Sequence, residues 1–273
     1  MTSQRNLIGF LILCLIWGST WIGISAGVRT VPPVIFAGTR FAAAGVLLLA
    51  IATFRHGFIV PAPGERLRLL AASVLSITLC YAPLFWGMKY VASGTAAVLE
   101  MSLTPLALLG FAICLREESW NRTRGVAIAV GTVGLAILFL PDASLDPDQS
   151  SDNAMKVLGA AAVAWAAISS AWGSILSRAL LSQHHPILIA GWTTLVGGLL
   201  LITTSIAFEP GGAAALTRGW EKEAMAGWIF LVIFGSVVGY TIYMRLIRYR
   251  ITCRELCFRV PGNRHHDWNR VQW

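Results

Sequence analysis

Charged residues are scarce in this sequence of 273 residues. Only 12% of them are Asp, Glu, Lys or Arg, whereas 56% are hydrophobic and the mean hydropathy is +0.68. A soluble domain carries about 25% charged residues, so this chain lacks the polar surface needed to face water on all sides. The composition therefore argues against an ordinary soluble protein and predicts a membrane protein.

The sequence also lacks the common motifs of catalysis and nucleotide binding. It contains no Walker A loop, no H-E-x-x-H and no G-x-S-x-G. We therefore expect no enzymatic activity and no cofactor or metal ion. The net charge of +8 is typical of basic cytoplasmic loops in membrane proteins and does not indicate a nucleic-acid partner.

Long apolar runs, in contrast, are abundant. Eight of them are long enough to cross a bilayer. Each is expected to be a helix, because lipid offers no partner for open backbone groups. The fifth run is the least apolar. The predicted spans are residues 7–28, 34–54, 69–88, 95–115, 124–140, 157–176, 186–208 and 225–247.

The distribution of Arg and Lys predicts the orientation in the membrane. With a cytoplasmic N-terminus, ten of these residues fall in inner segments and five in outer segments. Positive residues favour the cytoplasmic side, so we expect a multi-pass protein of the cell (inner) membrane with its N-terminus inside. The inner residues are Arg5, Arg55, Arg66, Arg68, Arg116, Arg122, Arg124, Arg178, Arg245 and Arg248, and the outer ones are Arg29, Lys89, Lys156, Arg218 and Lys222.

A pattern from the first three spans returns in the last three, at offsets of 155, 153 and 159 positions. Because the repeat unit has five spans, an odd number, the second copy is expected to be inverted in the membrane. Inverted repeats are typical of secondary transporters, whose substrate site lies near the midplane between the repeats. The matched positions are Trp17 with Trp172, Pro33 with Pro186, and Tyr81 with Tyr240.

Five short motifs carry a resemblance to a known family. They are Trp17-Gly18-Ser19, Pro33 with Thr39-Arg40-Phe41, Ser93-Gly94-Thr95-Ala96-Ala97 leading to Pro105-Leu106, the stretch 131–135, and Trp172-Gly173-Ser174-Ile175-Leu176-Ser177. In order and spacing the sequence resembles the EamA-like family of the drug/metabolite transporter superfamily over residues 7–248. This resemblance implies a ten-helix transporter of small metabolites, built from two five-helix repeats.

We therefore expect an all-α membrane protein, a polytopic bundle of inverted five-helix repeats with about eight helices present. Residues 7–140 are predicted to form the first EamA-like repeat and residues 155–248 a truncated second one. The segment 249–273 is basic, with five Arg, two His and two Cys, and contains no spanning run.

That basic tail departs abruptly from the repeat. We interpret it as the product of a reading frame lost near codon 249, and the alternative is a natural eight-span protein with a basic cytoplasmic tail. Translating the other two frames of the gene would decide between them. Cys253 and Cys257 followed by His265-His266 are too loosely spaced to predict a zinc site.

Arg40 and Glu100 are the clearest charged residues inside predicted spans, well away from the span ends. Arg40 and Glu100 are each about seven residues, or about 10 Å, below the same membrane face. Placing a charge at the bilayer centre costs about 2.5–3.5 kcal/mol on insertion scales, so such residues are usually functional or paired. The sequence leaves open whether they form an ion pair that stabilises the fold or a substrate or proton site.

Hydroxyl and aromatic side chains near the repeated motif complete the candidate cavity. They could line a midplane cavity and bind substrate, or simply allow close helix approach. Gly235 and Gly239 likewise indicate a helix contact and leave a homodimer open. The candidate substrate-binding residues are Ser19, Thr20, Trp21, Arg40, Tyr81, Glu100, Trp172, Ser174 and Tyr240.

The predicted function is that of a multi-pass transporter embedded in the lipid bilayer. We expect an exporter of small metabolites, such as amino acids or related compounds, that works by alternating access around a midplane cavity. The alternative is a membrane receptor or scaffold, or an inactive remnant of such a transporter. Transport into or out of vesicles would distinguish these functions.

Overall fold

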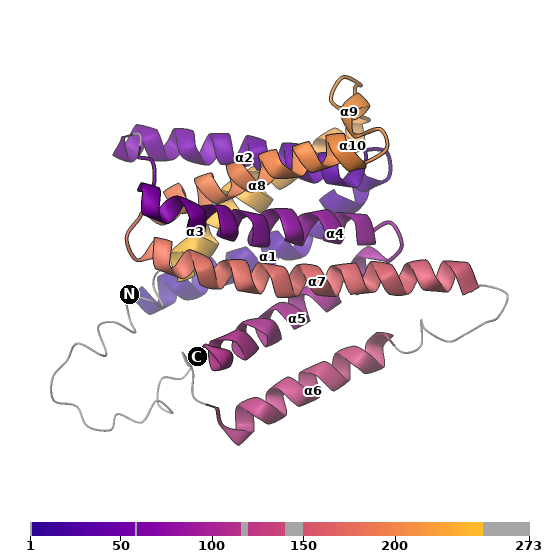
Figure 1. Cartoon of the computed structure of the whole chain (residues 1–273), viewed down its shortest axis with the longest axis horizontal. Helices are drawn as coiled ribbons and strands as arrows, with labels where there is room; N and C mark the ends of the chain where they lie inside the picture. Colours follow the sequence, from indigo (N-terminus) through magenta and orange to yellow (C-terminus); the bar gives the residue numbers. More distant parts are fainter. Residues whose placement is uncertain (1, 58, 116–119, 140–149, 248–273) are drawn as a thin grey trace.

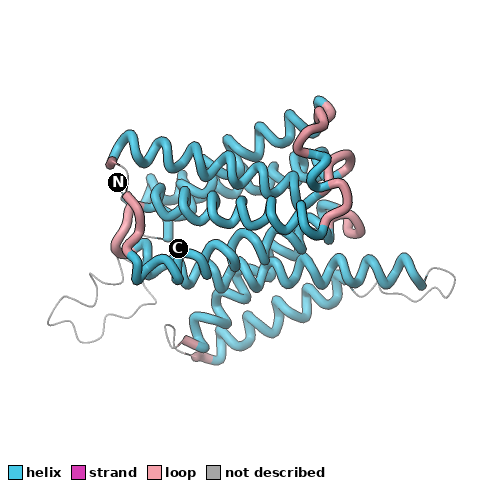
Figure 2. The backbone as a smooth tube through the Cα atoms, turned by 45° about the horizontal axis from the view of Figure 1, so that its top comes forward, coloured by secondary structure: helices cyan, strands magenta, loops and turns pink. Residues whose placement is uncertain are grey.

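The computed structural model describes residues 2–57, 59–115, 120–139 and 150–247. Within these ranges every regular element is a helix, and the long helices form one bundle (Figure 1; Figure 2). The predicted all-α polytopic fold is therefore confirmed. The basic tail, with the hypotheses about its reading frame and its Cys and His residues, lies outside the described residues.

All eight predicted spans are helical in the structure. Seven of them are long and apolar enough to cross a membrane, and α6 is not among these seven. The third and eighth spans are composite, because each contains a π-helical segment. The elements are α1 (Thr2–Val28), α2 (Pro33–His56), α3 (Pro63–Ser73), η1 (Val74–Thr78), α4 (Leu79–Gly87), α5 (Ser93–Cys114), α6 (Arg122–Phe139), α7 (Ser150–Leu181), α8 (Pro186–Phe208), α9 (Gly212–Ala215), α10 (Lys222–Phe230) and η4 (Leu231–Val238), with the last span continuing to Ile247.

Proline residues set where several helices begin. Pro33, Pro63 and Pro186 occupy the first turns of α2, α3 and α8, where a missing N–H group costs nothing. The first turn of α2 is capped from the other half of the chain. The backbone N–H groups of Val34 and Ile35 donate to the Glu209 carboxylate, at 2.9 and 3.0 Å.

Helices α2 and α8 form the most extensive helix pair of the bundle. Small residues let their backbones approach closely, as in many membrane helix pairs. The facing positions run in opposite directions, so the two helices are antiparallel. As numbers rise along α2 they fall along α8: Gly38 faces Ile202, Ala42 faces Gly198, Gly45 faces Leu195 and Leu49 faces Gly191.

This contact also shows the symmetry of the repeat. Gly191 is Gly38 shifted by the 153 positions that separate Pro33 from Pro186, and Gly198 is Gly45 shifted by the same number. Each glycine therefore has an equivalent glycine on the opposite helix, packed against the equivalent partner. A twofold relation between antiparallel helices is what an inverted repeat produces.

The π-helical segments obey the same relation. Segment η1 shifted by the 159 positions between Tyr81 and Tyr240 falls within η4. Each lies in the third helix of its repeat, just before one of these tyrosines. π-Helical turns are rare and occur frequently at functional sites.

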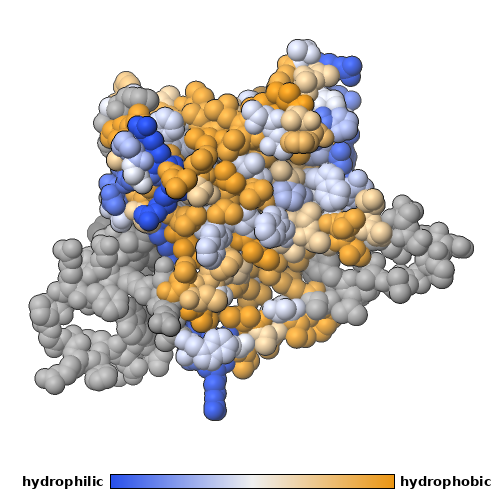
Figure 3. Space-filling model, in the orientation of Figure 1, coloured by the Kyte–Doolittle hydropathy of each residue, from blue (hydrophilic) through white to orange (hydrophobic). Residues whose placement is uncertain are grey.

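The surface has the pattern expected in a bilayer. Figure 3 shows apolar residues over the middle of the molecule and hydrophilic ones near its two ends. Helix α6 lies at the edge of the bundle (Figure 1) and exposes a stripe of Val126, Val130, Val133 and Ile137. In water such a stripe would be unfavourable, whereas lipid chains cover it.

We expect Gly45→Ala to destabilise the bundle, because its Cβ would meet the backbone of Leu195 on the facing helix. Overpacking of this kind costs about 1–3 kcal/mol. The matched control is Gly110→Ala, whose Cβ meets nothing and which should be neutral or stabilising by up to about 1 kcal/mol. Unfolding of both variants in detergent measures the difference, and equal stability would contradict this packing.

Candidate functional site

Arg40 lies in the middle of the bundle, on α2. It is only 3% exposed. Its guanidinium carbon lies over three aromatic rings, 4.3 Å from the centroid of Phe41, 5.4 Å from Tyr81 and 5.7 Å from Phe85. A cation over a ring face is attracted by the ring quadrupole, by about 2 kcal/mol when water is excluded. The surroundings of Arg40 are therefore an aromatic cage contributed by α2 and α4.

The cage belongs to a larger group of rings, here named the central aromatic cluster. Phe41 and Tyr81 lie 4.4 Å apart between centroids, and Phe41 and Tyr240 lie 6.0 Å apart. Trp17 contacts Tyr240 at 6.1 Å and Tyr243 at 5.1 Å. These separations are in the range in which aromatic pairs attract each other. The central aromatic cluster comprises Trp17, Phe41, Tyr81, Phe85, Tyr240 and Tyr243.

Hydrogen bonds join the two halves of the chain at this cluster. The hydroxyl oxygens of Tyr81 and Tyr240, the equivalent tyrosines of the two repeats, are 3.1 Å apart. Within the second half, the hydroxyl oxygens of Ser174 and Tyr243 are 2.7 Å apart. The indole Nε1–H of Trp17 donates to the carbonyl of Gly235, at 3.4 Å. Side chains far apart in the sequence thus meet where the repeats meet.

The structure does not form the ion pair between Arg40 and Glu100 that the sequence left open. Glu100 Oε1 accepts a hydrogen bond from the Thr104 hydroxyl, at 3.4 Å, one turn along its own helix. The Nε and Nη1 atoms of Arg40 are buried and have no hydrogen-bond partner among the described residues. Cys80 is 1% exposed and lies within electrostatic range of both charged groups. Arg40 and Glu100 thus both lie near Cys80 without forming an ion pair with each other.

Other predicted residues lie outside the central aromatic cluster. The hydroxyls of Ser19 and Thr20 donate to the carbonyls of Ile16 and Trp17 in their own helix, at 2.8 and 2.6 Å. Trp21 is buried in the hydrophobic core, and Trp172 packs edge-on against Phe111 of α5, at 4.7 Å. The methyl group of Thr20 closely approaches Gly235, which supports the interpretation that small residues here allow close helix contact.

Several cluster residues were not among the candidates predicted from the sequence. Trp17 was used only as a marker of the repeat, although the sequence places it beside the candidates Ser19 and Thr20. Phe41 and Phe85 carry no polar group, so no signal except proximity to Arg40 and Tyr81 could have indicated them. Tyr243 lies near the end of its span, a position typical of the membrane interface, but the structure places it against Trp17 and Ser174 inside the bundle. The Gly235 and Gly239 pair packs within the chain, against α1.

Two cavities open at one end of the bundle, between the loops that join its helices. One, of about 290 Å³, is lined by Pro32, Trp220 and Glu221, among others. The other, of about 540 Å³, is lined by residues that include Arg29, Met88 and Lys89. Rings connect the first cavity to the cluster, since Phe36 contacts Trp220 at 5.5 Å and Phe85 at 6.3 Å.

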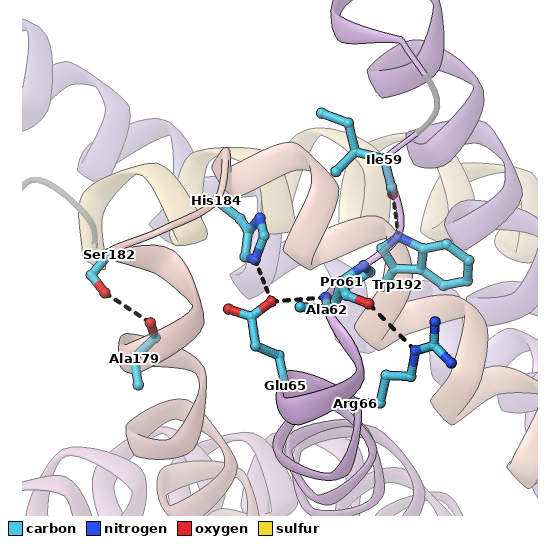
Figure 4. A network of polar contacts seen from close by, with 9 residues as sticks. All are labelled: Ile59, Pro61, Ala62, Glu65, Arg66, Ala179, Ser182, His184 and Trp192. Atoms are coloured by element: carbon cyan, nitrogen blue, oxygen red, sulfur yellow. Dashed lines mark hydrogen bonds and ion pairs between the residues drawn. The ribbon is translucent and has the colours of Figure 1, made fainter.

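A polar network lies at the opposite end (Figure 4). The Nε2 atom of His184, in the loop between α7 and α8, is 2.8 Å from Glu65 Oε2 at the start of α3. The same carboxylate oxygen accepts from the backbone N–H of Ala62, at 3.0 Å. The Trp192 indole donates to the carbonyl of Ile59, at 3.2 Å. The contacts of His184 and Trp192 join the second half of the chain to the first.

Within the described ranges, no group of three His, Cys, Asp or Glu residues is arranged to hold a metal ion. The chemistry available at the cluster is therefore that of one guanidinium, several phenol and indole groups and a carboxylate nearby. Such an arrangement can bind a small molecule through aromatic contacts and a few directed polar groups.

Comparison with known proteins agrees with this geometry. The family model described as the EamA-like transporter family matches residues 4–140. An inner membrane transporter of Escherichia coli K12, YedA, is 33% identical over 86% of this chain and 72% of its own length. A transporter of Bacillus subtilis, YoaV, is 26% identical over 83% of this chain and 74% of its own.

Two further similarities are more distant. A protein of Salmonella typhimurium named as a probable amino-acid metabolite efflux pump is 25% identical over 87% of this chain and 76% of its own length. A crystal structure with 21% identity covers 90% of this chain and 80% of that chain with a TM-score of 0.61, which shows a shared fold. From the matched model and the relative with 33% identity, the chain belongs to the EamA-like transporter family.

Proposed function

We propose that this protein exports small metabolites, such as amino acids or related compounds, across the inner membrane. The observation that carries the proposal is the contact between Tyr81 and Tyr240, because it brings equivalent residues of two inverted halves together beside a buried cation. Secondary transporters bind substrate at such a junction. The names of the relatives from Escherichia coli and Salmonella typhimurium support the membrane and the substrate class.

The proposed mechanism is alternating access around the central aromatic cluster. Residues 7–140 and 155–248 would be the two moving repeats, tied together at both ends of the bundle. At one end His184 contacts Glu65, and at the other Glu209 holds the first turn of α2. To open one end, the contact at that end must break while the contact at the other end persists. The cluster is then exposed to one side of the membrane at a time.

The π-helical segments support the same mechanism. Each interrupts the regular backbone pattern next to a cluster tyrosine, and mid-helix irregularities often mark hinges. Pro83 in α4 removes a further backbone donor within the same span. Bending at η1 and η4 would move Tyr81 and Tyr240 relative to α2 and α8 without unpacking those two helices.

The proposed orientation follows from the charge distribution. With the N-terminus in the cytoplasm, the tie between His184 and Glu65 closes the inner end and the two cavities face outward. Exposed residues at the two ends provide reporters for this orientation.

We expect a cysteine at Arg218 to react with a membrane-impermeant thiol reagent added outside intact cells, and a cysteine at Arg66 to react only after the cells are opened. Both positions should be tested in a chain whose native cysteines are replaced by Ser. Reaction of both from the same side would contradict the inverted topology, and the reverse pattern would contradict a cytoplasmic N-terminus.

We expect the full chain in proteoliposomes to release preloaded radiolabelled amino acids or related metabolites in a saturable manner. Tyr240→Phe should slow release about two- to tenfold, because it removes a hydrogen bond worth about 1 kcal/mol at the junction of the repeats. Tyr90→Phe, at an exposed tyrosine after α4, is the matched control. Release no faster than from protein-free liposomes, for every compound tested, would refute the proposed export.

We also expect the tie between His184 and Glu65 to control access to Cys80, which is buried beside the cluster. In a chain that keeps Cys80 alone, Glu65→Gln should raise its rate of modification by a water-soluble thiol reagent about two- to fivefold, as loss of a hydrogen bond worth about 0.5–1 kcal/mol predicts. The exposed Glu223 provides the control variant Glu223→Gln. Equal rates in both variants would argue against this tie as a gate.

A further inference from the structure

Arg40 is a buried cation that no described acid neutralises. It is 3% exposed, its Nε and Nη1 atoms have no hydrogen-bond partner in the part of the chain that the structure describes, and Glu100 bonds to Thr104 instead. The rings of Phe41, Tyr81 and Phe85 attract the charge, and the Tyr81 hydroxyl accepts a hydrogen bond from the guanidinium, but these contacts supply no negative charge and leave Nε and Nη1 unsatisfied. A buried charge without full compensation is costly, and side chains that carry one are commonly functional.

A second and independent observation concerns the larger cavity at the loop end. Arg29 and Lys89 lie among its lining residues, and none of the described residues that line it is acidic. A cleft lined by charges of one sign raises the local concentration of ligands of the opposite sign. The cavity therefore favours the entry of anions.

The cavity and the cage of Arg40 share one helical segment. Met88 lines the cavity and follows Tyr81 by seven residues, which is about 10 Å along a helix. Phe85 lies between them and contacts both Tyr81 and Arg40. Phe85 is fully buried and separates the cavity from the guanidinium, so a substrate that enters past Lys89 reaches Arg40 when the rings on α4 move aside.

From these observations we propose that Arg40 binds an anionic group of the transported molecule, and that this group is a carboxylate. This inference rests on the proposed transport function and narrows its substrate class to carboxylates. The planar guanidinium fork matches a carboxylate with two parallel hydrogen bonds. A single buried cation balances one negative charge, so a doubly charged phosphate would remain uncompensated, the more so because Glu100 lies in the same neighbourhood.

The test uses formate as a probe, because it is the smallest carboxylate and requires no knowledge of the substrate. Sodium formate replaces sodium gluconate at constant ionic strength, and formamide serves as the uncharged analogue. We expect formate, and not formamide, to raise the thermal unfolding temperature of the detergent-purified full chain. The rise should be lost in Arg40→Gln, partly kept in Arg40→Lys and unchanged in Arg55→Gln, which alters an exposed arginine of the same helix.

The stability of Arg40→Gln without formate separates binding from a structural role. If Arg40 is retained for a ligand, this variant should be at least as stable as the original chain, because it removes an uncompensated buried charge. A markedly less stable variant, or one that keeps the response to formate, would overturn the proposal. An equal response to formamide would overturn it as well.

A transport experiment completes the test, because it distinguishes failure of carboxylate recognition from failure of the proposed export. In proteoliposomes, unlabelled amino acids or other carboxylic acids should inhibit release of the labelled compound at concentrations at least about tenfold lower than their amides require. Arg40→Gln should abolish that preference. Release in which the amides compete equally well would refute carboxylate recognition while leaving export intact. Absence of any release would refute export itself, and with it the role assigned here to Arg40.

Discussion

The close antiparallel contact between α2 and α8 is the constraint on which the rest of the bundle depends. Paired glycines bring the two backbones together, and each glycine has its equivalent on the other helix. In lipid there is no hydrophobic force between helices, so association relies on close packing and interhelical hydrogen bonds. This central pair fixes where Arg40 lies and leaves the third helix of each repeat to close around it.

The two helices that carry the cluster tyrosines are less regular than α2 and α8. The third and eighth spans each contain a π-helical segment next to a cluster tyrosine. The hydrogen bond between Tyr81 and Tyr240 is therefore made by the two irregular helices and not by the rigid central pair. A stiff central pair with two interrupted helices beside it suits a protein that must expose one buried site to alternate sides.

Burying Arg40 costs free energy that its packing contacts do not fully offset. Aromatic rings surround it, yet two of its nitrogen atoms remain without hydrogen-bond partners. The sequence could show that a cation lies within an apolar span, and equal depth suggested Glu100 as its partner. Equal depth in the membrane does not show which way two side chains point around their helices, however. Glu100 accepts a hydrogen bond from Thr104 of its own helix instead.

The membrane spans and the repeat could be read from the sequence, because apolar runs and recurring motifs are local properties of the chain. All eight predicted spans are helical, and matched residues such as Pro33 and Pro186 begin equivalent helices. The site could be predicted only in part. Arg40, Tyr81 and Tyr240 do meet, whereas Trp172 packs against α5.

The sequence by itself thus determined which stretches are helical and which positions recur between the two halves. Only the tertiary structure decided which faces of those helices meet, because periodicity in lipid does not separate a core face from a lipid face when both are apolar. Trp17 and Trp172 occupy matched positions, yet Trp17 joins the cluster and Trp172 does not. Packing around each residue, and not its position in the repeat, made that difference.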